Sequence, residues 1–247
     1  MKDPSFQWTP AYWQGWREAQ NPYRQFKSER DRSLALQALH LREGDRVLEV
    51  GCGYGWISRA LLDSAKIRWV GIDLSESMVR ELRASLAEHQ PAAIVANAFQ
   101  LPFPAESFDK VLCSGVLMHL ADDSAALKEM VRVLRRDGTL ACSIHNALSP
   151  FSAPVRLRNR FKKGFIQNFQ LPAASRRRLE SLGLELREVA GDSLFATVPL
   201  QIGRFSFPPA RAFSLVRSLD QWAVERFAWL AYEVWFTAVK VSSPCAS

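Results

Sequence analysis

The chain has 247 residues, of which 48% are hydrophobic and 23% charged, and its formal net charge is +7. These values are ordinary for a soluble globular enzyme and predict one large α/β domain, or one domain with an inserted cap. The basic balance suits an anionic partner, whether a substrate, a nucleic acid or a membrane surface, and it does not choose among them.

The cysteines and the apolar stretches exclude several kinds of site. The four cysteines include no C-x-x-C pair, so neither a zinc site nor disulfides are indicated, and no metal is expected. Residues 1–10 have no apolar core of the kind that a signal peptide needs. Residues 222–241 are aromatic, but Glu225, Arg226 and Glu233 interrupt them too often for a membrane span. We therefore expect a cytoplasmic location.

Residues 1–44 are expected to be helical and aromatic, and strands then alternate with helices. Strands are predicted at 46–50, 68–72, 93–96, 109–114 and 138–145, and helices near 55–66, 76–89 and 122–135. This order predicts a parallel sheet with helices on both faces, whose ligands bind outside the carboxyl ends of the strands.

The alternation changes after residue 146. Residues 147–170 carry basic side chains among aromatic ones, and a helix near 172–182 and a strand at 184–189 are predicted to follow. Residues 191–220 are predicted to be irregular, with a closing strand at 232–241.

A hydrophobic strand that ends in a glycine-rich turn is the most informative feature of the chain. It runs from Val47 to Gly55 with the sequence VLEVGCGYG, and Asp73 ends the next strand, 22 positions after Gly51. Glycines let the backbone approach a ligand closely, and the following helix points free N–H groups toward it. A carboxylate at the position of Asp73 can accept both hydroxyls of a ribose.

Two residues favour S-adenosylmethionine (SAM) over a dinucleotide at this turn. The dinucleotide pattern is G-x-G-x-x-G. In this chain the position of its third glycine is occupied by Trp56, whose indole is too bulky to let a pyrophosphate pass. Glu49 is awkward beside phosphates but suits a cationic amino acid group. An NAD-dependent oxidoreductase is set aside for these reasons.

Four stretches together resemble class I SAM methyltransferases, in the small-molecule branch that includes the ubiquinone and menaquinone enzymes. They are residues 47–55, residues 71–78 (GIDLSESM), residues 101–104 with 107–109 (LPFP, SFD), and residues 132–138 (RVLRRDG). The resemblance implies a Rossmann-like class I methyltransferase fold with a mostly parallel seven-stranded sheet. Two positions depart from the family pattern: Asn97 replaces the usual Asp, and Arg136-Asp137-Gly138 replaces Pro-Gly-Gly.

The resemblance also implies roles for individual residues. Gly51 and Gly53 would line the methionine end of the cofactor, and Asp73 would hold the ribose. The expected cofactor-binding set is Glu49, Gly51, Cys52, Gly53, Asp73, Leu74, Met78, Asn97, Ala98, Phe99, Ser114 and His119. Within it, Leu74 and Met78 would flank the adenine, and the turn at residues 97–99 would meet its polar edge.

Methyl transfer needs alignment of nucleophile and methyl group more than covalent help from the protein. A base is needed only for a hydroxyl or a protonated amine, and His119 and His145 are the histidines predicted near the carboxyl edge. The alternative for each is a structural role, as a hydrogen bond at a helix entry or as a core residue.

Candidate substrate residues lie at both ends of the chain. Tyr12, Trp13 and Tyr23 are candidates for a lid over the cofactor, although aromatics at helical spacing are also typical of a plain core. Asn146 and Arg156 are placed on the substrate side. The basic run from Arg156 to Lys163 suits an anionic or lipid-linked substrate or a membrane surface, and equally a solvated charged face.

The sequence therefore predicts three parts: a helical aromatic lid (1–44), a SAM-binding core (45–145), and a basic excursion with a closing helix and antiparallel strands (146–247).

The predicted function is methyl transfer from SAM to a small-molecule or lipid-like acceptor, with S-adenosylhomocysteine as product. The expected location is the cytoplasm, or the periphery of the inner membrane face. The alternatives are an RNA methyltransferase and a non-catalytic SAM-binding scaffold. Nucleic acid is the less favoured partner, because residues 113–116 lack the Asp/Asn-Pro-Pro-Tyr/Phe run of enzymes that methylate base amines.

Overall fold

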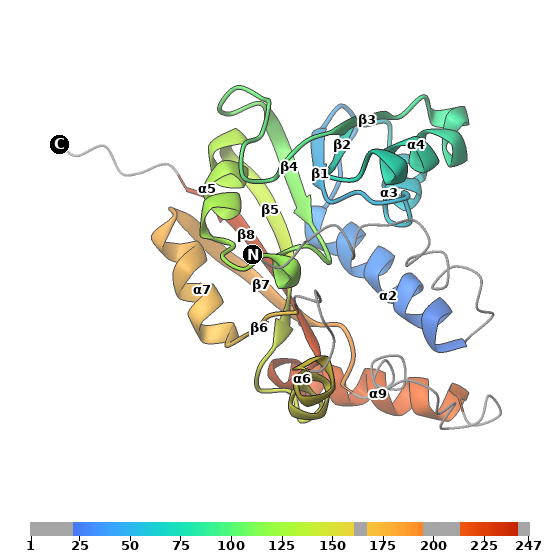
Figure 1. Ribbon diagram of the computed structural model, residues 1–247, viewed down its shortest axis with the longest axis vertical. Coiled ribbons are helices and arrows are strands. Elements are labelled where there is room, and N and C mark those ends of the chain that lie inside the picture. Colours follow the sequence, from blue (N-terminus) through green and yellow to red (C-terminus); the bar gives the residue numbers. More distant parts are fainter. Residues whose placement is uncertain (1–21, 161–166, 195–212, 242–247) are drawn as a thin grey trace.

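One twisted sheet organises the part of the chain that the computed structural model describes, which is residues 22–160, 167–194 and 213–241 (Figure 1). Its strands are β1 (Arg46–Val50), β2 (Arg68–Asp73), β3 (Ala92–Val95), β4 (Phe108–Cys113), β5 (Leu134–Asn146), β6 (Phe169–Gln170), β7 (Leu184–Gly191) and β8 (Glu233–Lys240). The α-helices are α2 (Pro22–Leu39), α3 (Ser58–Ser64), α4 (Glu76–Ser85), α5 (Ser124–Val133), α6 (Ser152–Arg160), α7 (Pro172–Ser181) and α9 (Phe213–Phe227). Short 3-10 helices are η2 (Ala87–His89), η3 (Leu117–His119) and η5 (Ala228–Leu230).

The strand order places a crevice at the middle of the sheet. The order is β3-β2-β1-β4-β5-β8-β7, with the two-residue β6 paired to β5. From β1 the chain first adds strands on one side and then returns to add β4 on the other. Such a reversal leaves an open crevice outside the carboxyl ends of the strands, where ligands bind. Only β8 among these strands runs against its neighbours, since it pairs antiparallel with both β5 and β7.

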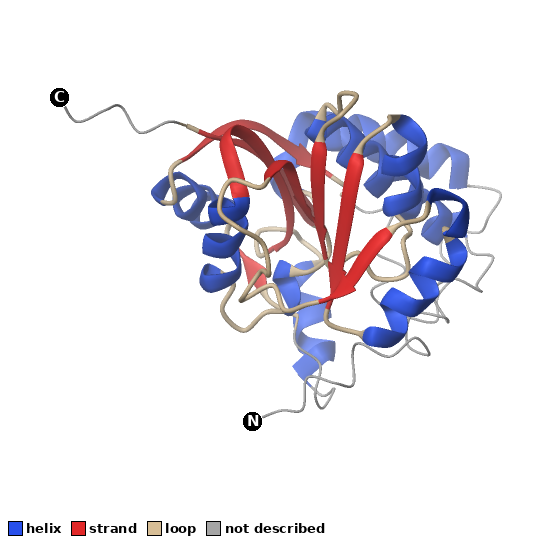
Figure 2. Ribbon diagram, turned by 90° about the horizontal axis from the view of Figure 1, so that it is seen from above, coloured by secondary structure: helices blue, strands red, loops and turns tan. Residues whose placement is uncertain are grey.

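Alternation along the strands builds a core on each face of the sheet. In β1, Val47 packs into the core under α2, α3 and α4, whereas Leu48 and Val50 pack into the core under α5 and α7. Successive side chains of a strand point to opposite faces, so a continuous apolar strand must be covered on both. Figure 2 shows helices on the two sides of the sheet. No helix of the described ranges is both long enough and apolar enough to traverse a bilayer.

The predicted fold class is confirmed, and most predicted elements lie within two residues of the observed ones. The strand predicted at 138–145 is longer (β5, Leu134–Asn146), and the helix predicted at 76–89 ends at Ser85 before η2. The irregular stretch predicted for residues 191–220 is wrong from Phe213, where α9 begins. In the closing part, which was predicted to carry antiparallel strands, β7 and β8 pair antiparallel with each other, and β8 also pairs antiparallel with β5.

Gly51 is required by both backbone conformation and space, and its substitution tests the turn. Its φ is +76°, and an added Cβ would lie 2.1 Å from Val116 Cγ2. We expect Gly51→Ala to lower the free energy of unfolding by about 3 kcal/mol, roughly 1 from the left-handed backbone and 2 from the forced movement of Val116. Urea unfolding of the variant and the wild type measures this change in the free energy of unfolding.

Gly44→Ala is the matched control, because Gly44 has a φ of +86° and nothing within 4 Å of an added Cβ. It isolates the backbone cost, which we expect to be about 1 kcal/mol. Equal losses in the two variants would contradict the proposed steric conflict with Val116.

Candidate active site

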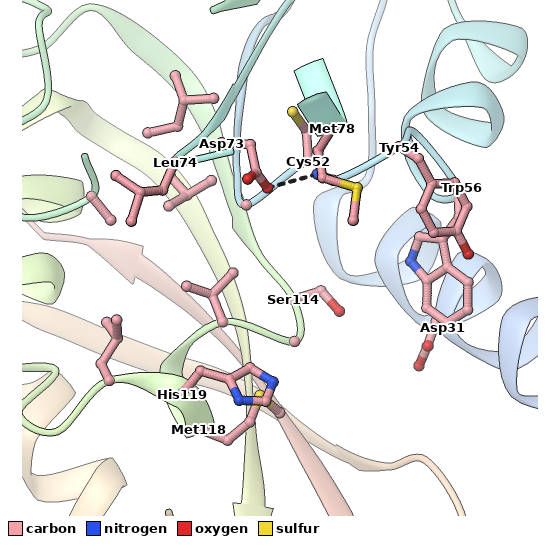
Figure 3. A pocket seen from close by; sticks show the side chains of 18 of the residues that line it. Asp31, Cys52, Tyr54, Trp56, Asp73, Leu74, Met78, Ser114, Met118 and His119 are labelled. Atoms are coloured by element: carbon pink, nitrogen blue, oxygen red, sulfur yellow. Dashed lines mark hydrogen bonds between the residues drawn. The ribbon is translucent and has the colours of Figure 1, made fainter. Parts of the chain in front are cut away.

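A cavity of about 260 Å³ opens at the carboxyl edge of the sheet (Figure 3). Residues at or just after the ends of β1, β2, β3 and β4 line it, together with residues of α2, η3, β5 and β8. Most of the predicted cofactor set is present: Gly51, Cys52, Gly53, Asp73, Leu74, Met78, Asn97, Ala98, Phe99, Ser114 and His119 line the cavity. The predicted set is thus brought together by strands that are far apart in sequence.

The glycine turn is held against the end of β2 by three backbone N–H groups. Gly51 N and Cys52 N donate to Ile72 O at 2.8 and 3.0 Å, and Gly53 N donates to Asp73 Oδ2 at 2.9 Å. The second carboxylate oxygen, Asp73 Oδ1, accepts from Ser75 N at 2.9 Å. Burial raises the pKa of Asp73, while these N–H donors act in the opposite direction. The carboxylate is therefore fixed in orientation at the cavity wall and keeps lone pairs for further donors.

An apolar platform lies beside the carboxylate. Met78 is buried in the first turns of α4, where Ser75 caps the helix by accepting from Met78 N at 3.4 Å. Leu74 and Phe99 line the cavity although 56% and 42% of their surfaces are exposed. Asn97 Oδ1 accepts from Phe99 N at 3.0 Å, which fixes the turn that carries the ring. Exposed apolar side chains at a cavity rim suit a flat ring that covers them.

The residues after β4 form another wall of the cavity, and this wall carries His119, the first predicted catalytic residue. Gly115 N donates to Ser143 Oγ at 3.1 Å, which ties this wall to β5, and His119 N donates to Val116 O at 2.8 Å in η3. Figure 3 shows the His119 ring in the cavity, across from Asp73. His119 is thus placed to contact a ligand on the side of the cavity opposite Asp73.

A buried ionic cluster forms the pole of the cavity nearest α2. Lys27 Nζ contacts Asp31, and it lies 3.0 Å from Glu233 Oε2 and 3.3 Å from Asp192 Oδ2. The four side chains are almost fully buried, and Lys27, Asp31 and Glu233 line the cavity. We refer to these four residues as the ionic pole.

The ionic pole holds one ammonium and three acidic groups, and their pKa values depend on one another. Burial acts to lower the pKa of Lys27, yet the three carboxylates hold it above its ordinary value. Burial raises the pKa of Asp31, and it raises that of Asp192 to about 6. The ammonium thus occupies the space between three carboxylates whose oxygens lie within 4.8 Å of one another, the place where a metal cation would otherwise bind.

His145, the second predicted catalytic residue, lies at the end of β5 beside this pole. Burial lowers its pKa to about 3, with Glu233 acting in the opposite direction, so the imidazole is neutral at physiological pH. Its Nδ1 lies 2.9 Å from Gln167 Nε2, and its ring packs 4.9 Å from that of Tyr232, centroid to centroid. Since an amide N–H₂ only donates, Nδ1 is the acceptor and Nε2 carries the proton.

Three predicted site residues do not line the cavity. Glu49 points into the core, where Oε2 accepts from Ser58 Oγ at 2.8 Å and from Trp69 Nε1 at 3.0 Å. Asn146 is buried and donates to the carbonyls of Trp229 and Ala231 at 2.7 and 2.9 Å, so it anchors a turn. Arg156 is exposed on α6. Glu49 and Asn146 are therefore turned away from the cavity, and the contact of Arg156 with a substrate or a membrane surface stays a prediction.

The predicted lid lies mainly outside the described residues. Tyr12 and Trp13 precede residue 22, and Tyr23 belongs to α2 but its side chain is outside the described part. The lid therefore stays a prediction.

The sequence reasoning missed the ionic pole and Gln167. The signals were present but weak: Lys27 and Asp31 have the i, i+4 spacing of a helical ion pair, and Glu233 is an acid inside an apolar strand. No sequence pattern pointed to Gln167, because residues 167 and 168 belong to no helix or strand.

Comparison with known proteins identifies the central segment. Residues 48–142 match the family model described as methyltransferase domain. A demethylmenaquinone methyltransferase of Symbiobacterium thermophilum is 34% identical over 125 residues, 47% of this chain and 48% of that protein. The match confirms the predicted resemblance over this segment. The chain spans about half the length of the curated relatives it matches.

Two further proteins share the fold. The uncharacterized methyltransferase YcgJ of Bacillus subtilis is 31% identical over 126 residues, 49% of each protein. Its crystal structure has a TM-score of 0.62 at 19% identity, covering 87% of this chain and 100% of that chain. Phosphoethanolamine N-methyltransferase 2 of Haemonchus contortus, solved with S-adenosyl-L-methionine, has a TM-score of 0.61 at 17% identity, covering 87% of this chain and 53% of that chain.

The buried Glu49 generates a prediction for the pH dependence of stability. Burial raises its pKa from 4.5 to about 7, so the folded state binds a proton more tightly than the unfolded state. The stability that the protonated Glu49 contributes to the folded state is complete below about pH 4.5 and is lost as the pH rises through about 7. Between these pH values the wild type should lose up to about 3 kcal/mol of its free energy of unfolding through Glu49, and the Glu49→Gln variant should not show this loss. Urea unfolding at several pH values measures the difference.

Glu76→Gln is the control, because Glu76 is an exposed acid that pairs with Arg80 on α4. It should leave the wild-type pH dependence unchanged. A Glu49→Gln protein whose stability falls with pH as steeply as the wild type would show that Glu49 is not a buried titrating acid.

Proposed function

We propose that this chain, whose residues 48–142 match the methyltransferase-domain model, is a SAM-dependent methyltransferase that acts on a small-molecule or lipid-like acceptor and releases S-adenosylhomocysteine. The observation that carries the proposal is the Asp73 carboxylate, oriented by Gly53 N and Ser75 N at the wall of a cavity. The relatives named as methyltransferases support the reaction type.

The residues present fit SAM. Asp73 retains lone pairs for the two ribose hydroxyls, and Gly53 leaves the approach open, because nothing lies within 4 Å of a Cβ added there. Leu74 and Met78 supply apolar surface for the adenine, with Asn97 at its polar edge. When bound, SAM supplies an electrophilic methyl group on a sulfonium.

The protein's contribution to such a transfer is placement. The donor end of the cavity, at Asp73 and Met78, faces His119 and the ionic pole across the same space, so an acceptor between them is held near the methyl group. The lining is mostly apolar, and it excludes water that would compete with the acceptor. His145 and His119 are the candidates to take a proton from the acceptor, because a neutral imidazole can accept one.

An acceptor with a flat apolar body and one or two hydroxyls fits this end of the cavity. Its apolar part would contact Met118 and Trp56, and its hydroxyls would meet Asp31, Glu233 or His145. The demethylmenaquinone methyltransferases matched by the central segment support a small acceptor of this kind. An acceptor that dissolves in lipid would bring the protein to a membrane surface as a peripheral protein. Residues 1–44 are assigned to a lid, residues 45–145 to donor binding, and residues 146–247 to the acceptor side.

Asp73 provides the direct test of donor binding. We expect Asp73→Ala to weaken the affinity for SAM and S-adenosylhomocysteine by a factor of roughly a hundred, because the ribose acceptor and the anchor of Gly53 N are both lost. Calorimetry with each nucleoside measures the affinity.

Asp63→Ala, at an exposed acid of α3, is the matched control and should bind SAM as the wild type does. Wild-type protein that binds neither nucleoside would refute the proposed function. Binding without methyl transfer to any of a panel of hydroquinones, phenols and amines would favour the non-catalytic scaffold.

His145 provides the test of proton transfer. If it takes the acceptor's proton, His145→Gln should lower kcat by about a hundredfold or more while the dissociation constant of SAM stays unchanged. The pKa of about 3 for the wild-type imidazole means that its protonation causes no loss of activity from pH 5 to pH 8. Transfer of a labelled methyl group from SAM to the best acceptor of the panel measures kcat.

His40→Gln serves as control, because His40 is exposed beyond the end of α2. The same substitution at His119 tests the other candidate. An activity step near pH 6.5 that disappears in the His145 variant would contradict the buried, neutral imidazole.

A further inference from the structure

The outer side of α9 carries an apolar stripe that no described residue covers. Leu215, Leu219 and Trp222 are 63%, 49% and 56% exposed. With Arg226 they are spaced four, three and four residues apart, so they share one side of the helix. Large apolar side chains gathered on one exposed face mark a contact surface, whereas scattered ones do not.

The helix is attached to the body by its other sides. Ala223 and Val224 are buried, and buried Asp220 accepts from Leu194 N at 3.0 Å. Arg217, half a turn away from the stripe, lies 3.8 Å from Glu29 and over the ring of Phe26, both on α2. The apolar arc of α9 is thus wider than the part that packs on the protein, and the remainder faces outward.

Exposed apolar side chains extend this surface past the end of α9 and onto α6. Phe227 and Trp229, which follow the stripe, are 40% and 55% exposed, and Leu157 on α6 is 61% exposed. Trp229 O accepts from Asn146 Nδ2 at the end of β5, shortly before α6 begins. In Figure 1, α6 and α9 lie along the same edge of the molecule. We call Leu157, Leu215, Leu219, Trp222, Phe227 and Trp229 the apolar ridge.

Positive charge borders the ridge. The Arg226 guanidinium lies 6.0 Å from the centre of the Trp222 ring, and Arg156 is exposed next to Leu157. Residues 152–163 contain five basic residues and no acid. Of the acids on α9, Asp220 is buried and Glu225 lies on the polar side. Tryptophan and leucine flanked by arginine are typical of helices that lie in the interface of an anionic membrane.

We propose that the apolar ridge docks this protein on a membrane surface that contains anionic lipid. The ridge adjoins the ends of β5 and β8 at which the cavity opens, since His145 and Glu233 line the cavity and Asn146 contacts Trp229. A lipid-like acceptor would then reach the cavity from the bilayer. This last step rests on the proposed function, whereas docking itself does not.

The test is flotation of the full chain with vesicles of phosphatidylglycerol and phosphatidylcholine, and with vesicles of phosphatidylcholine alone. We expect retention on the anionic vesicles that falls as salt is added, and little retention on the zwitterionic ones. The double variant Leu219→Ser with Trp222→Ser should reduce partitioning by roughly tenfold or more, since it removes two large apolar side chains from the interface. Arg226→Gln should weaken it to a smaller degree.

The double variant Leu171→Ser with Val189→Ser is the matched control, because these exposed apolar side chains lie on the α7 side of the sheet. Thermal unfolding and SAM binding, measured on every variant, separate this result from a failure to fold and from a failure of the proposed function. Wild-type protein that ignores anionic vesicles, or a ridge variant that floats like the control, would overturn the proposal. A dimer that dissociates in the ridge variant would also overturn it, by showing that a second copy covers the ridge.

Discussion

The hydrogen bond from Gly53 N to Asp73 Oδ2 is the interaction on which the site depends. It joins the loop after β1 to the end of β2, so the two neighbouring strand ends act as one rigid unit. The donors Gly51 N and Cys52 N, both directed at Ile72 O, reinforce the same junction. A carboxylate held from two sides by backbone N–H groups has little freedom to change its orientation. In the proposed function, donor binding would therefore need little reorganisation at this end of the cavity.

The opposite end of the cavity is organised by charge. Lys27 links α2 to β8 through Glu233 and to the residue after β7 through Asp192, so the ionic pole both closes the cavity and fixes α2 over the sheet. A buried ammonium surrounded by carboxylates stays charged, and the removal of Lys27 would leave three buried acidic groups without their cation. Burial keeps the His145 imidazole beside it neutral, because its pKa is lowered to about 3. In the proposed function, the cavity thus has a donor end organised by backbone N–H groups and an acceptor end organised by side chains.

Much of the fold was predictable because local pattern and global architecture agree. The apolar runs of β1, β2 and β4 and the amphipathic spacing of α4 and α5 each favour the element that forms, and their order admits a parallel sheet. The prediction failed at α9, where prolines before Phe213 suggested an irregular segment that extends too far.

The sequence by itself determined the family resemblance, the fold class and the donor end of the site, because glycine spacing and a strand-terminal Asp73 are short-range features whose geometry follows from the local chain. Only the tertiary structure decided which side chains share the acceptor end. Lys27, His145, Asp192 and Glu233 lie on four segments that are remote in sequence, and burial there sets their protonation. Only the structure, likewise, turned Glu49 and Asn146 inward and left Leu219 and Trp222 outside. Periodicity shows that a side of a helix is apolar, whereas packing decides whether that side is covered.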